Sequence, residues 1–273
     1  MPKKLSPTKA TQTLGVSGSN VKNGQIRSDE FIPELRGRTA IRKYREMRDN
    51  DSTIGAVMYA AEQVLRDVKL KIEPANDSEE AKREAEFVES IFKDMEHTLD
   101  DHIAEALSSL SYGFSWFEVV YKRRVGPTST NYKKYSKYTD GRIGVRKIAV
   151  RAPWTIDKFE VESKTGDVLG IYQNTGYSSS GSHYIPTSKS LYYRTTSING
   201  DPSGRSILRN AYTSYQYLNN LQSIEAIAVE RELAGIPVAR IPSEYLFSGA
   251  DASQAAFVAN LESILRDVKF NEQ

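Results

Sequence analysis

The stretch that decides the fold is Gly200–Tyr212, GDPSGRSILRNAY, because a turn-forming sequence runs directly into a helical pattern. Its Asp-Pro-Ser-Gly segment is typical of a tight turn, and Ser203 can cap a following helix. From Arg205 onward, apolar residues recur at helical spacing, and no proline interrupts them before Pro237. The pattern therefore predicts a helix of about 30 residues, roughly 45 Å long. That length favours a strut over an ordinary packing helix.

The same stretch could instead cradle a phosphate, but it lacks the Gly-Lys-Ser/Thr ending of a phosphate loop. No GxSxG, HExxH or His-containing triad occurs elsewhere in the sequence. The chain has no cysteine, and its histidines are too scattered for a metal site (His97, His102 and His183). We therefore expect no enzymatic activity, no metal and no cofactor, and we interpret His102 as a structural histidine beside an apolar helix face.

The order of patterns predicts an α+β fold. Residues 1–30 are rich in Ser, Thr, Gly and Lys and are interpreted as a flexible basic arm. Apolar residues at helical spacing then predict helices over 52–68, 78–95 and 99–112, a further helix in the tail after Pro242, and a short strand over 70–73. Residues 114–197 predict short strands separated by turns. No apolar run reaches the ~20 residues of a membrane helix, and the N-terminus lacks a signal-peptide core, so we expect a soluble protein assembled in the cytoplasm.

Charge is segregated although the net charge is only +2. Residues 76–105 are strongly acidic and residues 121–151 strongly basic, which indicates separate partners, complementary faces of an oligomer, or solvated faces of one domain. Within the basic block, lysines alternate with tyrosines, and such residues can pair with phosphates and stack on bases. The candidate nucleic-acid or partner contacts there are Lys133, Lys134, Lys137 and Tyr135.

Five motifs in a fixed order carry a resemblance to a known family. They are YREMRDNDSTIGAVMYAAEQVLRDVKLKIEP (44–74), ALSSLSYGFSWFEVVYKRR (106–124), DGRIGVRKIAVRAPWTIDKFEVESKTGDVLGIYQ (140–173), GDPSGRSIL (200–208) and ELAGIPVARIP (232–242). With these motifs the chain resembles the portal proteins of tailed bacteriophages, and within them the Mu-like portal family.

The resemblance implies a portal-like wing domain of helices and small antiparallel strands over 31–203, a stem helix over 204–234, and the start of a clip region over 235–273. It also implies a ring, usually of twelve subunits, at one capsid vertex of the virion. Double-stranded DNA would pass through the ring, whose partners would be the major capsid protein, the terminase and a head–tail adaptor. Portals of this type continue past this point with the rest of the clip, a second stem helix, a tunnel loop and a crown, so the end at Gln273 departs from the pattern.

Charged residues are the candidates for the contacts of such a ring. On the stem, Arg205, Arg209 and Arg231 are candidates to face DNA or a neighbouring subunit, and bracing a neighbour is the favoured role. The candidate subunit-interface residues are Arg42, Lys43, Arg45, Glu84, Glu86 and Glu89. The alternative function is a monomeric nucleic-acid-binding module that uses the Lys/Tyr-rich segment 121–151.

Overall fold

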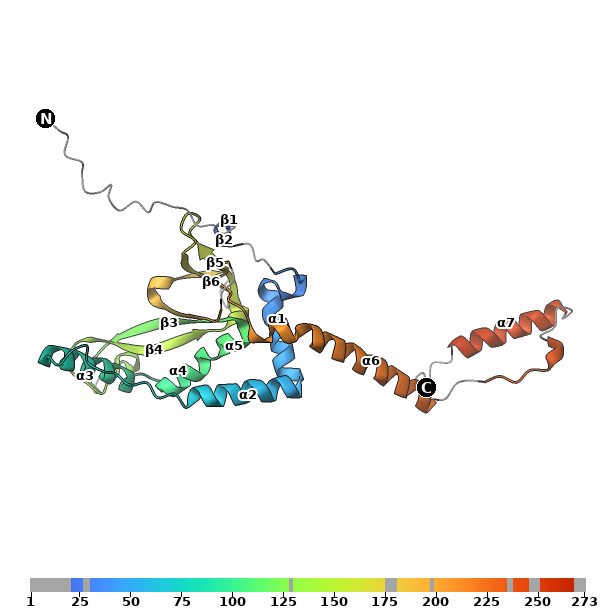
Figure 1. Ribbon diagram of the computed structural model, residues 1–273, viewed down its shortest axis with the longest axis horizontal. Coiled ribbons are helices and arrows are strands. Elements are labelled where there is room, and N and C mark those ends of the chain that lie inside the picture. Colours follow the sequence, from blue (N-terminus) through green and yellow to red (C-terminus); the bar gives the residue numbers. More distant parts are fainter. Residues whose placement is uncertain are drawn as a thin grey trace, which may run out of the picture. The chain divides into compact units, whose positions relative to one another are not determined.

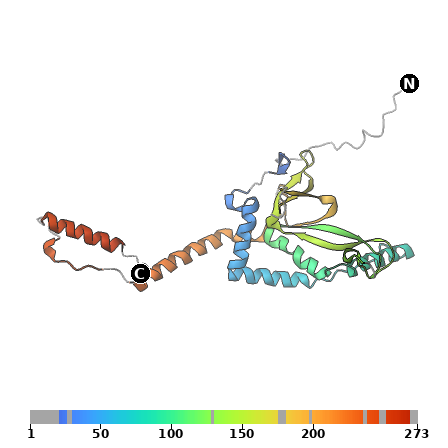
Figure 2. The same cartoon turned by 180° about the vertical axis from the view of Figure 1, so that it is seen from behind.

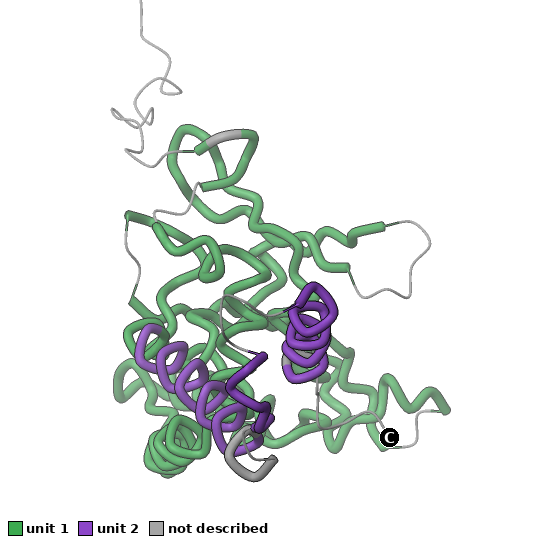
Figure 3. The backbone as a smooth tube through the Cα atoms, turned by 90° about the vertical axis from the view of Figure 1, so that its right-hand side faces the viewer, with its two compact units in different colours: residues 1–212 green, residues 213–273 purple. Residues whose placement is uncertain are grey.

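The computed structural model describes residues 21–26, 30–127, 130–174, 181–196, 199–234, 238–245 and 251–267. The chain divides into two compact units, residues 1–212 and 213–273 (Figure 3). Most of the predicted N-terminal arm lies outside the described residues. Helices and antiparallel sheets together make up the first unit, so the α+β prediction is confirmed at this level.

Five helices of the first unit precede its main sheets (Figure 1). They are α1 (Gly37–Asn50), α2 (Ser52–Arg66), α3 (Glu79–Lys93), α4 (Leu99–Ala106) and α5 (Ser108–Tyr112). Asp51 caps α2, since its side chain accepts hydrogen bonds from the backbone N–H groups of Thr53 and Ile54. Gly113, at φ 90°, ends α5 in the left-handed conformation expected of a glycine there.

Two details of the predicted helical region were wrong. The strand expected over 70–73 does not form, because those residues pair with no other strand. A strand needs a partner, which a local pattern cannot supply. The helix expected over 99–112 is divided into α4 and α5 at Leu107, whose N–H bonds the carbonyl oxygens of both Ile103 and Glu105.

Two antiparallel three-stranded sheets follow. One has the order β4-β3-β8, from β3 (Phe114–Arg123), β4 (Ile143–Arg151) and β8 (Ser190–Arg194). The other has the order β5-β6-β7, from β5 (Ile156–Val161), β6 (Val168–Gln173) and β7 (His183–Pro186). A short hairpin, β1 (Val21–Lys22) with β2 (Gln25–Ile26), contacts β5.

The core lies on both faces of β3, because successive residues of a strand point to opposite sides. On one face Trp116, fully buried, contacts the rings of Phe159 on β5 and Tyr192 on β8. On the other face Phe117, also fully buried, meets the ring of His102 on α4 edge-on at 4.6 Å. The predicted structural role of His102 is confirmed, because it is 4% exposed and its Nε2 lies 2.9 Å from the Tyr193 hydroxyl.

The Asp-Pro-Ser-Gly turn packs directly on the end of α5. Gly204, at φ 62°, comes so close to Gly113 that a Cβ on Gly204 would lie 2.1 Å from the Gly113 carbonyl oxygen. Only glycine fits such an approach in this conformation. The Thr195 hydroxyl lies 2.9 Å from that same oxygen and 2.7 Å from the Arg205 carbonyl oxygen, so it fastens the turn to β8.

The long helix begins later than predicted. Residues 207–211 form a 3-10 turn, η6 (Ile207–Ala211), and the helix proper is α6 (Tyr212–Ala234). Ser206, and not Ser203, supplies the cap of η6: its hydroxyl accepts a bond from Leu208 N and donates to the Ser111 carbonyl. The second unit also contains η7 (Ser243–Tyr245) and α7 (Ala252–Asp267). The stop predicted at 235–237 lies outside the described residues.

Candidate assembly and nucleic-acid interface

The outer face of α1 is basic. Arg38, Arg42 and Arg45 lie three and four residues apart, opposite the side chains that α1 buries, so they share one face. Arg38 pairs with Asp157 at 3.0 Å, and Arg45 pairs with Asp49 at 3.5 Å. Arg42 is exposed and has no ion pair within the described part of the chain.

Lys43, which was predicted as an interface residue together with Arg42 and Arg45, does not lie on this outer face. Its Nζ lies 2.9 Å from Glu46 Oε2 within α1. Of the basic candidates in this segment, Arg42 therefore carries the charge that is most available to a partner.

The outer face of α3 is acidic. Glu84 and Glu86 are exposed and form no ion pair among the described residues, whereas Glu89 pairs with Lys93 at 2.7 Å. Figures 1 and 2 show α1 and α3 at opposite ends of the first unit. The structure therefore does not bring the predicted basic and acidic interface residues together within one copy.

The basic block contains a buried ion pair, Lys122 with Asp94, that its sequence did not reveal. Lys122 on β3 is 7% exposed, and its Nζ lies 3.1 Å from Asp94 Oδ2 and donates to the carbonyl oxygens of Asp94 and Tyr135. Asp94 also accepts from the Ser136 hydroxyl at 2.6 Å and from Lys137 N at 2.7 Å. Burial pushes the pKa of Asp94 upward, but these hydrogen bonds and the Lys122 charge outweigh it and lower that pKa.

Arg124 forms a second buried anchor. It is 1% exposed, donates to Ser90 on α3 at 2.8 Å, and pairs with Asp140 at 3.3 Å. Its guanidinium lies over the Tyr138 ring at 4.0 Å and also faces the Phe87 ring at 5.2 Å. Lys122 and Arg124 thus hold the long connection between β3 and β4 against the rest of the unit.

The candidate contacts on that connection separate into two groups. Lys133 and Lys134 lie exposed on the 3-10 turn η3 (Tyr132–Lys134), followed by Tyr135, which is 51% exposed. Lys137 instead donates its Nζ to the Lys93 carbonyl at 2.8 Å. Two further cations of the block are paired, Arg146 with Glu96 and Arg151 with Glu118. The surface available to a nucleic acid is therefore smaller than the sequence predicted.

The arginines before α6 also have partners. The Arg209 guanidinium bonds both carboxylate oxygens of Glu30, at 2.6 and 2.8 Å, and lies over the Phe31 ring at 5.2 Å. Burial alone would raise the pKa of Glu30, yet the bonds from Arg209 and from Ile32 N lower it. Arg205 donates to the Asn210 side chain at 2.8 Å. Both arginines precede α6, so they do not share a face of the long helix, and the Arg231 side chain lies outside the described residues.

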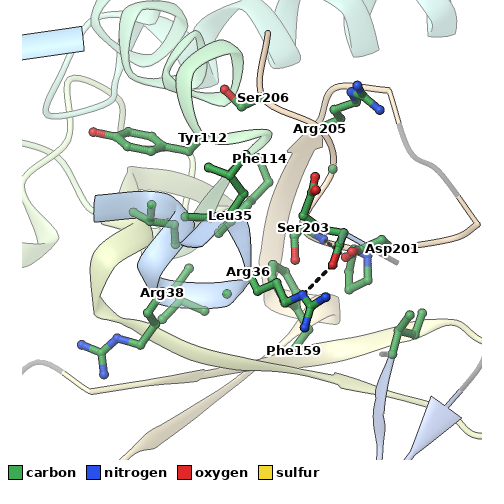
Figure 4. A pocket seen from close by; sticks show the side chains of 18 of the residues that line it. Leu35, Arg36, Arg38, Tyr112, Phe114, Phe159, Asp201, Ser203, Arg205 and Ser206 are labelled. Carbon is green, nitrogen blue, oxygen red and sulfur yellow. Dashed lines mark hydrogen bonds between the residues drawn. The ribbon is translucent and has the colours of Figure 1, made fainter. Parts of the chain in front are cut away.

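A cavity of about 630 Å³ lies beside this junction, between the start of α1, β5 and the turn at residues 201–206. Figure 4 shows Arg36, Ser203 and Phe159 among the side chains that line it, with Phe159 below the other two in the view. Its lining mixes charges of both signs, because Glu30, Asp157 and Asp201 line it together with Arg and Lys side chains. Such a lining does not select one class of ligand.

The exposed side of α6 differs from all these surfaces. Between Arg209 and Glu225 the sequence contains no Asp, Glu, Lys or Arg. Tyr217 is 66% exposed, Leu221 44% and Ile224 64%. An apolar surface of this kind on a helix normally meets a partner.

Sequence reasoning missed the significance of this neutral segment because it looked for charged residues.

Within the described ranges, no three His, Asp or Glu side chains gather as metal ligands. None of the helices in those ranges combines the length and hydropathy that a bilayer crossing requires.

Comparison with known proteins gave one family, and the similar solved structures include two of gene transfer agent particles. A chain in the structure of the virion of a native gene transfer agent particle is 10% identical, with a TM-score of 0.47; the match covers 81% of this chain and 54% of that one. A second chain comes from a structure of the neck of an empty gene transfer agent particle, which was computed with C6 symmetry. It is 12% identical, with a TM-score of 0.44, and the match covers 81% of this chain and 55% of that one. The chain therefore spans about half the length of these two.

No curated protein matches the chain. The family model described as the portal protein of Mu bacteriophage matches residues 41–269. That range contains every helix and strand described here from α2 to α7 and most of α1. The chain thus belongs to the Mu bacteriophage portal protein family.

Proposed function

We propose that this chain assembles into a ring at one vertex of a phage-like capsid, and that the ring is a channel for packaging and ejecting double-stranded DNA. The observation that carries the proposal, together with the family, is the exposed apolar surface of α6, which a single copy leaves in water. Covering it with further copies removes that cost. Residues 31–203 would be the wing, 204–234 the stem, and 235–273 the start of the clip.

The charged ends of the first unit fit this role. A closed ring with one copy after another uses heterologous contacts, in which two different faces of the same chain meet. Arg42 at one end, and Glu84 and Glu86 at the other, offer unlike faces to neighbours. In the virion the ring would bind the major capsid protein, the terminase during packaging and a head–tail adaptor afterwards. Twelve subunits is the number that the family resemblance suggests.

Gel filtration followed by negative-stain microscopy tests the proposal. We expect a ring with a central hole of duplex width. A clean monomer that shifts short oligonucleotides would instead support the alternative, a nucleic-acid-binding module that acts through Lys133, Lys134 and Tyr135.

The charge-reversal variant Arg42→Glu tests the basic face. We expect it to reduce the fraction of chain in rings, whereas Lys134→Glu, which reverses another exposed cation, should leave that fraction unchanged. Equal ring fractions in the two variants would show that the outer face of α1 is not part of the subunit interface.

A further inference from the structure

A short segment leads into α1. It consists of residues 30–36, is called here the strap, and contains the 3-10 turn η2 (Pro33–Leu35). It ends at Gly37, the first residue of α1, which adopts a φ of 53°. No atom lies within 4 Å of the position that a Cβ would take on Gly37. A glycine with open space around it permits a change of backbone direction, so Gly37 can serve as a hinge between the strap and α1.

The strap is held in shape by polar bonds. The Arg36 guanidinium donates to the carbonyl oxygens of Glu30 at 2.5 Å and of Phe31 at 3.3 Å, and the Ile32 N–H donates to Glu30 Oε1 at 3.1 Å. Leu35 is the one side chain of the strap that is buried, whereas Phe31 is 75% exposed. Because so little of the strap is buried, its position depends mainly on polar bonds to the rest of the chain.

Two such bonds run to the start of the long helix. The Arg209 guanidinium in η6 bonds both carboxylate oxygens of Glu30, and the two side chains are 13% and 17% exposed. The hydroxyl of Tyr212, the first residue of α6, donates to the Glu34 carboxylate. These bonds join residues 179 and 178 positions apart. A bidentate bond between arginine and carboxylate fixes orientation as well as distance, so the strap and η6 are held in one arrangement.

The turn η6 also depends on contacts outside itself. It is a 3-10 turn, whose hydrogen bonds have poorer geometry than those of an α-helix. Leu208, which is 5% exposed, holds it to the core, and the Ser206 hydroxyl bonds the Ser111 carbonyl oxygen. The strap adds a third attachment through Arg209. Each of the two segments therefore gains stability from the bond that it shares with the other.

We propose that the strap and η6 form one coupled element, which the bond between Glu30 and Arg209 keeps closed. Opening this bond frees both segments in the same event while the sheets stay folded, as in other local openings of native proteins. The coupling is reciprocal: a contact that moves the strap loosens the start of the long helix, and a contact that shifts η6 loosens the strap. The inference does not depend on the proposed ring, because all these residues belong to the first unit of a single chain.

Hydrogen exchange of the whole chain tests the coupling in Glu30→Gln, which keeps the shape of the side chain but removes its charge. Exchange should become about tenfold faster at the Leu35 and Arg36 amides of the strap, and also at the Arg209 and Tyr212 amides. Loss of a hydrogen bond to a charged group shifts an opening equilibrium by about that factor. All four amides bond carbonyl oxygens within their own segment, and none bonds Glu30, so their exchange reports opening.

Arg209→Met tests the reverse direction. Although it changes no residue of the strap, it should speed exchange at the strap amides, and the amides of β3 should exchange as slowly as in the unsubstituted chain. Arg38→Met is the matched control, because it breaks a nearby ion pair, with Asp157, that does not involve η6. It should leave exchange at the Arg209 and Tyr212 amides unchanged.

Three results would overturn the inference. Faster exchange in the strap alone in Glu30→Gln, or an unchanged strap in Arg209→Met, would show that the two segments open independently. Equally faster exchange at β3 would show that the bond supports the whole first unit instead of one local element. An equal effect of Arg38→Met on η6 would show that any ion pair in this region matters as much. None of these results bears on ring formation, so the proposed function is tested separately.

Discussion

The first unit and α6 differ in what they bury. In the first unit even a lysine and an arginine are buried, and each is matched: Lys122 by Asp94 and two carbonyl oxygens, Arg124 by Asp140, Ser90 and aromatic rings. On α6, apolar side chains such as Tyr217 and Ile224 are exposed. The first unit also exposes apolar side chains, such as Val64 on α2 at 73%, but it has a buried core of its own, whereas no described side chain of α6 after Tyr215 is buried. The difference teaches that the first unit is stabilised by its own contacts, and that this part of α6 contributes none of its side chains to a core.

The largest effect should come from breaking a buried pair in the first unit. Lys122→Met leaves the Asp94 carboxylate buried without its cation, which costs about 3–5 kcal/mol. Urea unfolding followed by circular dichroism should show this loss, with Lys134→Met, at an exposed position, within about 0.5 kcal/mol of the unsubstituted chain. A small loss for Lys122→Met would mean that the first unit does not depend on its buried ions.

The glycine contact should give the next largest effect. Gly204→Ala adds a Cβ 2.1 Å from the Gly113 carbonyl oxygen at a positive φ, so strain and overpacking together should cost about 2–3 kcal/mol. Gly141→Ala is the matched control, because Gly141 has a similar φ of 66° with no atom within 4 Å of the added Cβ. The control should lose about 1 kcal/mol in the same unfolding measurement. Equal losses would show that the backbone contact is not tight.

A smaller effect is expected on the way the unfolding free energy depends on pH. Burial first, and the nearby His97 second, lower the pKa of His102. Below a pH of about 6.5 the unfolded chain therefore binds a proton that the folded chain does not, and stability falls as pH falls, by at most about 1.4 kcal/mol per pH unit. His102→Gln should flatten the dependence of the unfolding free energy on pH between 5 and 7. His183→Gln, at an exposed residue, should leave it unchanged.

The smallest effect on stability should come from α6 itself. Leu221→Ala removes an exposed side chain, so the unfolding free energy of the first unit should change by less than about 0.5 kcal/mol. Ring formation, measured by gel filtration, should fall in the same variant. A change in first-unit stability with unchanged ring formation would contradict the contrast between the two regions.

Local signals in the sequence predicted the parts of the fold that local chemistry decides. The tight turn expected at Asp-Pro-Ser-Gly depends on a few neighbouring atoms, and it is confirmed, because the Gly204 N–H bonds the Asp201 carbonyl oxygen and Gly204 adopts a φ of 62°. The expected strand over 70–73 failed because pairing is a long-range property. The start of the long helix was misplaced because Ser206 is held by the Ser111 carbonyl, 95 residues away.

The candidate sites were harder to predict, because a lysine in a basic block looks the same whether it faces water or a buried carboxylate. Lys122 and Arg124 showed this most clearly. The neutral face of α6 was visible in the sequence as fifteen residues without charge, but reading it required knowing where the helix begins and which arginines already have partners.

The contact between Gly113, Thr195 and Gly204 also determines how the first unit bears mechanical load. Thr195 is bonded to Gly113 through both its backbone N–H and its hydroxyl, and the Arg205 N–H is bonded to that hydroxyl at 3.2 Å. A pull on the chain at Tyr212 would therefore reach α5 and two strands together, through several short bonds in parallel. Because these bonds share one load, we expect the joint to resist a pull better than any one of them would alone.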